Sequence, residues 1–375
     1  MNRVGKILDQ RWVFLGLIVA GFDARLALAS LGGNYDMQSW FMVADITAHG
    51  GNVYAETFRY NYGPIWFLLL HGLDLLAAHH QLVLRYLIAI FLSLVDLGIC
   101  AFLCQRAGRL VGMLFFLNPV SIIITGYNCQ FDNMAILLGL WSVHLLGDDF
   151  DAPLNRRKLC GLLVLGFSLV VKHVFFLFPF WLAVKQKGAW SKIAVLLMPI
   201  TCFLLGFSFY WPAGREGILH NVFGYQSCYA PYFYQLFMPA WILHGCALRM
   251  AWYGLLMLLA FVCRARNGFE SLLIYTGALV ALSPALENHF LVIPIVLAAV
   301  HFNPIFVIYT IFSVCFLFAD TRNEPRLWIG SDARIDRFAS YALDCALVWL
   351  LWRPQCVQLF HAARREIAIQ WGRKI

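Results

Sequence analysis

Residues Leu82–Cys104, LVLRYLIAIFLSLVDLGICAFLC, decide the class of this fold. Arg85 and Asp96 are the only charged residues in this run. The run is longer than the roughly 20 apolar residues that cross a bilayer core of about 30 Å as a helix. Several other apolar runs lie on both sides of it along the chain. The sequence therefore predicts an all-α, polytopic transmembrane protein.

The composition points to the same class. The 375 residues are 61% hydrophobic and 13% charged, whereas charged residues make up about 25% of ordinary soluble domains. The net charge is +8, but Lys and Arg gather between apolar runs, as they do in the inner loops of membrane proteins. We therefore expect membrane lipids, and no nucleic acid, as partners. The 11 cysteines are scattered without a C-x-x-C pair, so neither a zinc site nor a disulfide framework is expected.

The bias of Lys and Arg toward the inner side predicts a single integral-membrane domain over residues 1–375, with about twelve spans and both ends inside. The first outer loop, residues 32–81, is expected to carry two interfacial helices, Met37–Ile46 and Ile65–Leu76. The predicted spans are residues 12–31, 82–104, 110–125, 134–146, 159–171, 174–184, 193–210, 236–263, 272–282, 290–299, 306–319 and 338–352. Two further outer loops and a basic inner tail are expected at residues 211–235, 320–336 and 353–375.

The first outer loop contains the main candidate for catalysis, Asp36, directly before the predicted helix Met37–Ile46. Gly50 and Gly51 end this helix, because glycine adopts the positive φ that a helix C-terminus needs. A helix N-terminus favours an ionised carboxylate. Asp36 is therefore either the N-cap of the helix or a general base that removes a proton from an acceptor hydroxyl. Asp45, nine residues later, is expected on roughly the same side of the helix.

The charge bias places a second polar segment on the same outer face as Asp36. Gln130 and Asp132 follow Gly126 at the point where one predicted span ends and the next begins. Asn and Asp are common helix caps, so one interpretation is a polar helical turn. The alternative is that Gln130 and Asp132 bind hydroxyl groups of a sugar.

Two later positions carry charge on the same face. Lys172 interrupts an apolar run, which is costly unless it reaches water, a partner or an anion such as phosphate. Glu287 and His289 follow Ser283-Pro284 at a broken helix end. A histidine at such a position either belongs to a capped loop or meets an anion. A site shared by these residues and Asp36 is a hypothesis that the sequence alone permits.

The motifs follow one another in a recognisable order: Tyr35-Asp36, Gly50–Tyr54, Tyr60–Pro64, Asn118-Pro119, Gly126–Asp132, Lys172-His173 and Ser283–His289. This order, over about residues 12–294, resembles that of the GT-C superfamily of integral-membrane glycosyltransferases, which use polyprenyl-phosphate sugars. Two positions depart from the pattern. Gln38 stands where many members have a second carboxylate, and Gly63 precedes Pro64 in place of a double proline.

The resemblance implies an enzyme that moves a hexose, of mannose or glucose type, from a polyprenyl-phosphate donor to a lipid-linked or glycan acceptor, with inversion. Asp36 would be the general base, and Lys172 and His289 would offset the charge of the leaving phosphate, so no metal or other cofactor is expected. Further substrate contacts are expected from Asp45, Arg59, Tyr60, Tyr62, Gln130, Asp132 and Glu287.

Two other functions remain open from the residues. Asp23, Arg25 and Asp96 lie within predicted spans, where ionisable residues mark ion or substrate paths unless they pair structurally. This motivates the alternative of a transporter or flippase for a polar or lipid-linked substrate. A non-catalytic partner subunit is the third possibility. The absence of organelle signals favours a bacterial cytoplasmic membrane, with the site facing outside.

Overall fold

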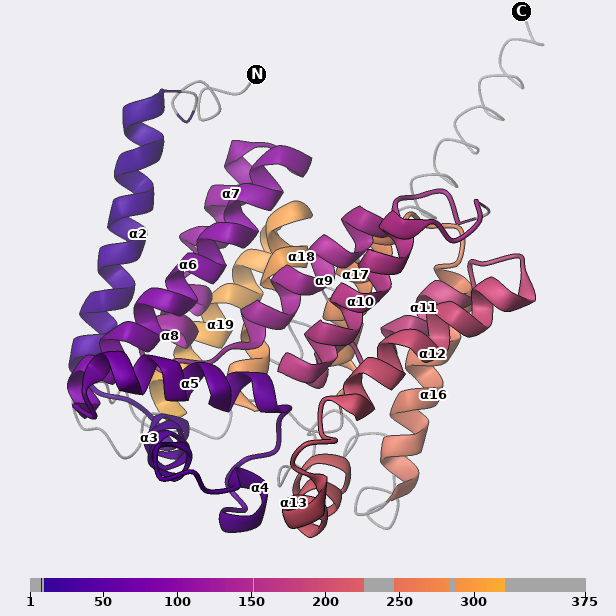
Figure 1. The fold of residues 1–375 in the computed structure, drawn as a ribbon. Coiled ribbons are helices and arrows are strands. Elements are labelled where there is room, and N and C mark those ends of the chain that lie inside the picture. The colour runs from indigo at the N-terminus through magenta and orange to yellow at the C-terminus, as the bar shows by residue number, and fades with distance from the viewer. Residues whose placement is uncertain (1–7, 9, 151, 226–245, 284–286, 321–375) are drawn as a thin grey trace, which may run out of the picture.

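The computed structural model describes residues 8, 10–150, 152–225, 246–283 and 287–320, and within these ranges the chain is helical without a β-strand. Figure 1 shows the helices as a bundle, several of them running between its upper and lower ends. The all-α prediction is confirmed for the described residues. The predicted span 338–352, the tail 353–375 and nearly all of the loop 320–336 lie outside the described residues.

Two helices are long and apolar enough to cross a membrane: α2 (Arg11–Leu31) and α6 (Gln81–Ala107). They confirm the predicted spans 12–31 and 82–104 and the assignment to membrane proteins. The other apolar helices of the described chain have 10–17 residues or belong to one bent pair. The number of about twelve spans therefore stays a prediction.

The bent pair is the predicted span 110–125, which consists of α7 (Arg109–Phe116) and α8 (Pro119–Gly126) with a bend of 49°. Asn118 explains the break, since its side chain accepts a hydrogen bond from the backbone N–H of Val120 and caps a new helix. Pro119 follows at the first helical position, where its missing N–H costs nothing.

The predicted continuous span 174–184 is wrong. These residues form a single 3-10 turn, η1 (His173–Phe175), followed by the six-residue helix α11 (Phe178–Ala183). At about 1.5 Å per residue, α11 covers only about 9 Å, far less than a bilayer core. Pro179 lies at the start of α11, where it favours a new helix over continuation of the previous one.

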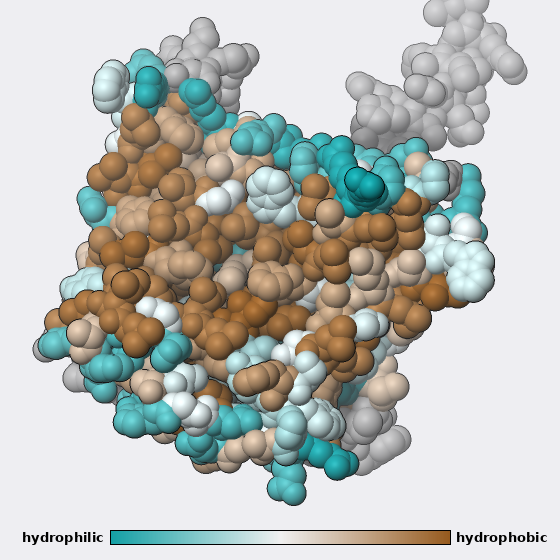
Figure 2. Space-filling view, in the orientation of Figure 1, coloured by the Kyte–Doolittle hydropathy of each residue, from teal (hydrophilic) through white to brown (hydrophobic). Residues whose placement is uncertain are grey.

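Most of the remaining helices follow the predicted apolar runs within a few residues, but the predicted span 290–299 is divided between a 3-10 turn and a six-residue helix. Residues 226–235 of the predicted outer loop and residues 236–245 of the predicted span 236–263 lie outside the described residues. The remaining helices are α9 (Asp132–Leu146), α10 (Arg156–Val171), α12 (Ala189–Leu205), α16 (Cys246–Val262), α17 (Gly268–Ala281), η3 (Asn288–Val292), α18 (Ile295–Val300) and α19 (Pro304–Asp320). Figure 2 shows an apolar band across one face of the molecule, with polar rims at both ends of the helices. This distribution is typical of a membrane protein.

The lower end of the bundle in Figure 1 holds short helices that cover the ends of the longer ones; we call it the site end. They are α3 (Tyr35–Ala48), α4 (Val53–Glu56), α5 (Pro64–Ala77), α13 (Trp211–Gly217) and the π-helix η2 (Ile218–Phe223). α3 and α5 confirm that the predicted interfacial segments are helical, and α5 lies across the direction of α2 in Figure 1.

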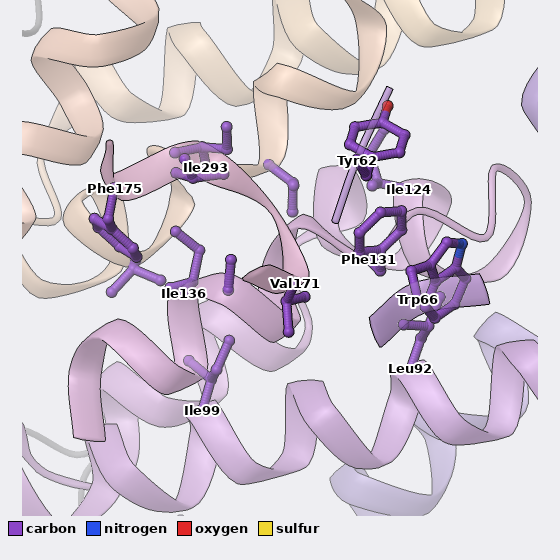
Figure 3. Packing of buried hydrophobic residues seen from close by; sticks show 14 of the residues in the cluster. Tyr62, Trp66, Leu92, Ile99, Ile124, Phe131, Ile136, Val171, Phe175 and Ile293 are labelled. Carbon is purple, nitrogen blue, oxygen red and sulfur yellow. The ribbon is translucent and has the colours of Figure 1, made fainter. Parts of the chain in front are cut away.

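An aromatic cluster fixes α3 and α5 to the bundle. The rings of Trp66 and Phe131 are stacked with their centroids 4.3 Å apart, and Tyr62 meets Phe131 edge-on at 5.0 Å. Trp40 of α3 contacts both Trp66 and Phe131 at 5.8 and 5.7 Å. Figure 3 shows Tyr62, Trp66 and Phe131 side by side in the core. Aromatic packing of this kind holds the first loop in one position.

Candidate active site

Asp36 is not the N-cap of α3, contrary to one of the two interpretations of the sequence. Asn34 caps the helix: its side-chain oxygen accepts a hydrogen bond from the backbone N–H of Met37 at 3.3 Å. The half-buried carboxylate of Asp36 instead accepts hydrogen bonds from two side-chain amides, Gln130 Nε2 at 2.7 Å and Asn34 Nδ2 at 3.3 Å. Asp36 is thus held in place without being used as a cap.

The turn that carries Gln130 is held close to α2 and α3. The indole Nε1 of Trp40 donates to the carbonyl oxygen of Cys129 at 3.1 Å, and the N–H of Gln130 donates to Ile124 at 3.1 Å. Gly126 allows this approach, because a Cβ there would lie 2.6 Å from the carbonyl oxygen of Arg25. A glycine is therefore required at position 126 for a steric reason, which the sequence motif does not reveal.

A buried ion pair lies next to this turn. Lys172 Nζ is 2.7 Å from Asp132 Oδ2, and both side chains are almost fully buried. The ammonium also lies over the rings of Tyr62 and Phe131, 4.7 and 4.9 Å from their centroids. Lys172 ends α10 and Asp132 begins α9, where the helix N-terminus favours a carboxylate. The predicted turn of Gln130 and Asp132 thus binds Asp36 and Lys172.

A cavity of about 130 Å³ opens beside Lys172. An engineered cavity of about 150 Å³ holds one benzene molecule, so the volume suits a single small group. Three of its lining residues have a buried nitrogen without a hydrogen-bond partner in the described chain: His173 Nδ1, Trp252 Nε1 and His289 Nδ1. Glu287 and Tyr62 also line it. The cavity therefore combines the Lys172 cation and the indole N–H of Trp252 with the carboxylate of Glu287 and two histidine nitrogens, which donate a hydrogen bond to an oxyanion when Nδ1 carries the proton.

Burial raises the pKa of the Asp36 carboxyl above its ordinary value. The positive charge of Lys172, the hydrogen bond from Asn34 and the charge of Arg59 act in the opposite direction, whereas the charge of Asp132 adds to the rise. A raised pKa suits a general base, because a carboxylate of higher pKa accepts a proton more readily. The pKa of Asp36 is thus set by its burial and by the charged and hydrogen-bonding residues around it.

Two predicted substrate contacts lie elsewhere. Asp45 lies on the exposed side of α3, with its side chain 75% exposed, and pairs with His49 at 3.5 Å. The prediction that Asp45 shares a side with Asp36 is wrong, since nine residues make two and a half helical turns. Tyr60 is fully buried and its hydroxyl donates to the carbonyl of Gly63 at 2.6 Å, so it supports the loop.

Arg59 lies at the exposed side of the site. Its guanidinium stacks on the ring of Tyr35, the residue before Asp36, with 3.6 Å between Cζ and the ring centroid. Apart from Asp45 and Tyr60, the predicted residues thus divide into three groups. Asp36, Gln130, Asp132 and Lys172 are joined by contacts, Tyr62, Glu287 and His289 meet Lys172 around the cavity, and Arg59 stands beside Tyr35.

The sequence predictions missed Asn34 and Trp252 as members of the site, and they gave His173 no role of its own. Asn34 offered a signal, because an Asn just before a helix is a common cap. His173 follows Lys172 in the chain, so the same break in the apolar run could have pointed to it. Trp252 offered no signal, since a tryptophan in an apolar helix usually packs against the core or the lipid interface.

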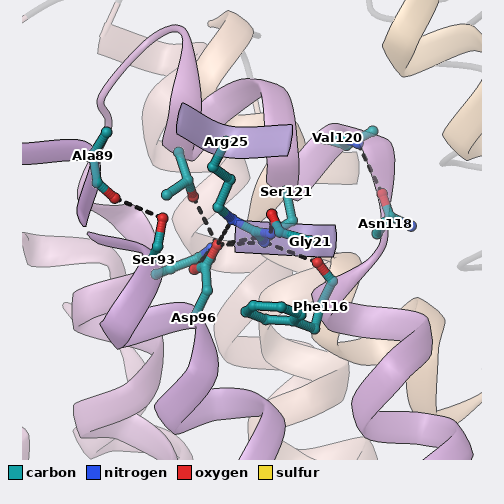
Figure 4. A network of polar contacts seen from close by, with 11 residues as sticks. Gly21, Arg25, Ala89, Ser93, Asp96, Phe116, Asn118, Val120 and Ser121 are labelled. Atoms are coloured by element: carbon teal, nitrogen blue, oxygen red, sulfur yellow. Dashed lines mark hydrogen bonds and ion pairs between the residues drawn. The ribbon is translucent and has the colours of Figure 1, made fainter. Parts of the chain in front are cut away.

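A second polar network lies behind the site, among α2, α6, α8 and α9 (Figure 4). Asp96 Oδ2 is 2.8 Å from Arg25 Nη2, and both side chains are fully buried. Asp96 also accepts hydrogen bonds from Ser121, Thr125 and Asn133, at 3.0, 2.8 and 2.6 Å. Asn133 directly follows Asp132, so the network also holds the start of α9. The structural pairing of Arg25 and Asp96, one of the two interpretations of the sequence, is confirmed.

No protein-family model, no curated protein and no solved structure matches this chain. Within the described ranges, no group of three or more His, Cys, Asp and Glu side chains is arranged to hold a metal ion. The expectation of a reaction without a metal or other cofactor stays a prediction. The functional argument therefore depends on the geometry of the site.

Proposed function

We propose that this protein is an integral-membrane glycosyltransferase of the GT-C type, with about twelve spans. It transfers a hexose from a polyprenyl-phosphate donor to a lipid-linked or glycan acceptor, with inversion at the anomeric carbon. The reaction takes place at the site end, which faces outside, in the cytoplasmic membrane of a bacterium. The proposal keeps the function that the order of sequence motifs implies.

One observation carries the proposal: a carboxylate held by side-chain amides lies beside a buried cation that borders a cavity. Gln130 and Asn34 hydrogen-bond to Asp36, and Asp132 of the same turn pairs with Lys172, whose positive charge acts on Asp36. A positioned base and a positioned cation are the two groups that a transfer from a sugar phosphate needs. Asp36 is free for this role because Asn34 caps the helix.

The proposed reaction is a displacement at the anomeric carbon. Asp36 removes the proton of the acceptor hydroxyl as its oxygen forms the new bond to that carbon. The bond between the anomeric carbon and the phosphate oxygen breaks, and the bonding electrons leave with the polyprenyl phosphate. Because attack occurs opposite to the leaving group, the configuration of the sugar inverts.

The cavity is the proposed place of the leaving phosphate. Lys172 supplies a positive charge, while His289, His173 and Trp252 supply nitrogen atoms that lack a partner in the described chain. Such groups stabilise the charge that grows on the phosphate oxygens as the bond breaks. The pairing of Lys172 with Asp132 leaves the ammonium two further protons for hydrogen bonds.

The transporter or flippase hypothesis has less support. It was motivated by charged residues within the predicted spans. Two of them, Arg25 and Asp96, form a buried pair that also bonds to groups on three further helices, α7, α8 and α9. Charged groups bonded in this way connect the helices of the bundle. Their presence within the spans is therefore explained without an ion path through the protein. A proteoliposome assay in which substrate flux persists without sugar transfer would favour the transporter.

The proposed function is tested with purified protein in lipid nanodiscs and a panel of polyprenyl-phosphate hexoses labelled in the sugar. We expect transfer of mannose or glucose to a lipid-linked glycan, and a product with the inverted anomeric configuration by NMR. Retention of configuration would exclude the proposed displacement. No transfer from any donor by a monodisperse sample would favour the transporter or a non-catalytic subunit.

A further inference from the structure

Tyr35 and Arg59 form an exposed aromatic and cationic pair at the edge of the site. The Arg59 guanidinium carbon lies 3.6 Å from the ring centroid of Tyr35, and Nη2 donates to the Tyr35 carbonyl oxygen at 2.8 Å. The Tyr35 side of this pair is open, since the residue is 58% exposed. The Nε atom of Arg59 is buried and has no hydrogen-bond partner in the described part of the chain.

The pair is directly connected to the proposed base. Tyr35 and Asp36 are neighbours in the first turn of α3, and the charge of Arg59 is one of the two cationic charges that act on Asp36. The other is Lys172, which is buried and borders the cavity. Asp36 thus has one cation toward the interior and one toward the exposed side.

A structural role alone would leave part of this arrangement unexplained. Arg59 does attach its loop to α3, and the Thr57 hydroxyl oxygen accepts a hydrogen bond from the N–H of Arg59 at 3.1 Å. Such an attachment does not require a large exposed ring, and Phe58 beside it is also 80% exposed. Exposed rings next to a guanidinium are suited to bind a sugar face and an anion together.

We propose that Tyr35 and Arg59 form the acceptor subsite, and that they select an acceptor with an anionic group near the attacking hydroxyl. The inference rests on the proposed function. An inverting displacement places the acceptor opposite to the leaving phosphate, and the phosphate is assigned to the interior cavity beside Lys172. The acceptor then lies on the other side of Asp36, where Tyr35 and Arg59 are found. The planar guanidinium matches the geometry of a phosphate or a carboxylate.

The experiment measures transfer from one donor to three acceptors of equal length: a neutral glycan, the same glycan with a phosphomonoester, and the same glycan with a hexuronate. The protein is the full chain in nanodiscs, as wild type, Arg59→Gln, Arg59→Lys and Tyr35→Ala. The phosphorylated and hexuronate arms identify which anion is recognised. The KM for the donor serves as a control for an intact interior cavity.

We expect Arg59→Gln to raise the KM for an anionic acceptor by about 10–100-fold, because hydrogen bonds to charged groups have this strength. The KM for the neutral acceptor should rise less than the KM for the anionic acceptors, and the KM for the donor should change less than about twofold. The KM of Arg59→Lys for an anionic acceptor should lie between those of wild type and Arg59→Gln. Lysine keeps the positive charge but lacks the planar guanidinium that donates two parallel hydrogen bonds. Tyr35→Ala should raise the KM for all three acceptors.

Equal KM values for neutral and anionic acceptors, in wild type and Arg59→Gln alike, would overturn the subsite and leave the proposed function intact. Absence of transfer by wild type to every acceptor would overturn the proposed function and the subsite with it. If the Arg59→Gln sample is not monodisperse, the acceptor preference of Arg59→Lys tests the subsite in its place. A lysine variant with unchanged preference for anionic acceptors would then contradict recognition by the guanidinium fork.

Discussion

The side-chain amide of Gln130 donates a hydrogen bond of 2.7 Å to the carboxylate of Asp36, 94 residues earlier in the chain. This contact joins the first loop to the turn between α8 and α9. Two residues after Gln130, Asp132 holds Lys172 at 2.7 Å. A single turn therefore positions both the proposed base and the proposed phosphate-binding cation, which explains why motifs far apart in sequence belong to one site.

The charge of Lys172 should set the lower pH limit of activity. Asp36 must be ionised to act as a base, so activity rises as the pH increases through its pKa. Burial raises this pKa and Lys172 lowers it, so Lys172→Gln should move the acidic limb of the kcat/KM profile to higher pH. Residual activity in Lys172→Gln should also be about 10²–10³-fold lower, because a stabilising cation is lost.

The control for this prediction is Lys172→Arg, which keeps the charge beside Asp132. Its acidic limb should stay close to that of wild type even if its maximal rate falls. An acidic limb that moves to lower pH in Lys172→Gln would contradict the assignment of Asp36 as the titrating base.

Removal of one partner of the buried Arg25–Asp96 pair should strongly destabilise the fold. Asp96→Asn leaves the buried Arg25 without its counter-ion, and breaking such a pair by removing one partner costs about 3–5 kcal/mol. Unfolding in mixed detergent micelles, followed by tryptophan fluorescence, measures this change. The control is Asp45→Asn in α3, outside the spans: its side chain is 75% exposed, and its variant should stay within about 0.5 kcal/mol of wild type.

Gly63 should tolerate no side chain. A Cβ at this position would meet the carbonyl oxygen of Val170, which belongs to the last turn of α10 before Lys172. Gly63→Ala must therefore push the loop away from α10, at a cost of about 1–3 kcal/mol. We expect a lower melting temperature and a higher KM for the donor, since Tyr62 and Lys172 would separate.

Gly72 of α5 gives the matched control, because a Cβ there meets no atom within 4 Å. Gly72→Ala should leave stability and KM unchanged or slightly improve stability, because alanine favours the helix. A Gly63→Ala variant as stable as Gly72→Ala would show that the loop does not pack on α10 as described.

Much of the fold could be predicted from apolar run length and helix signals. The helices α2 and α6 agree with their predicted spans within a few residues, and α3 ends before Gly50, whose φ is +73°. The break at Pro119 and the short helix α11 were not predicted, because run length does not show where a proline ends a helix.

The site was predicted less completely, for a physical reason. Charge bias placed Asp36, Asp132, Lys172 and His289 on one side of the bundle, and the structure brings their elements to the site end. Which polar groups bond to one another depends on how helices pack, and the spacing along the chain does not determine that. Gln130 and Asp132 were interpreted as a polar turn or as sugar-binding residues. The structure shows that they bond to Asp36 and Lys172, and sugar binding stays a prediction.

The most direct test of the central claim compares sugar transfer by wild type, Asp36→Asn and Asp45→Asn in nanodiscs. Both variants remove one carboxylate from the same α3 helix, and Asp45 is exposed and pairs only with His49 in the described chain. The account predicts that Asp36→Asn lowers kcat about 10²–10⁴-fold while Asp45→Asn stays within about twofold of wild type. Full activity in a monodisperse Asp36→Asn sample would contradict the account.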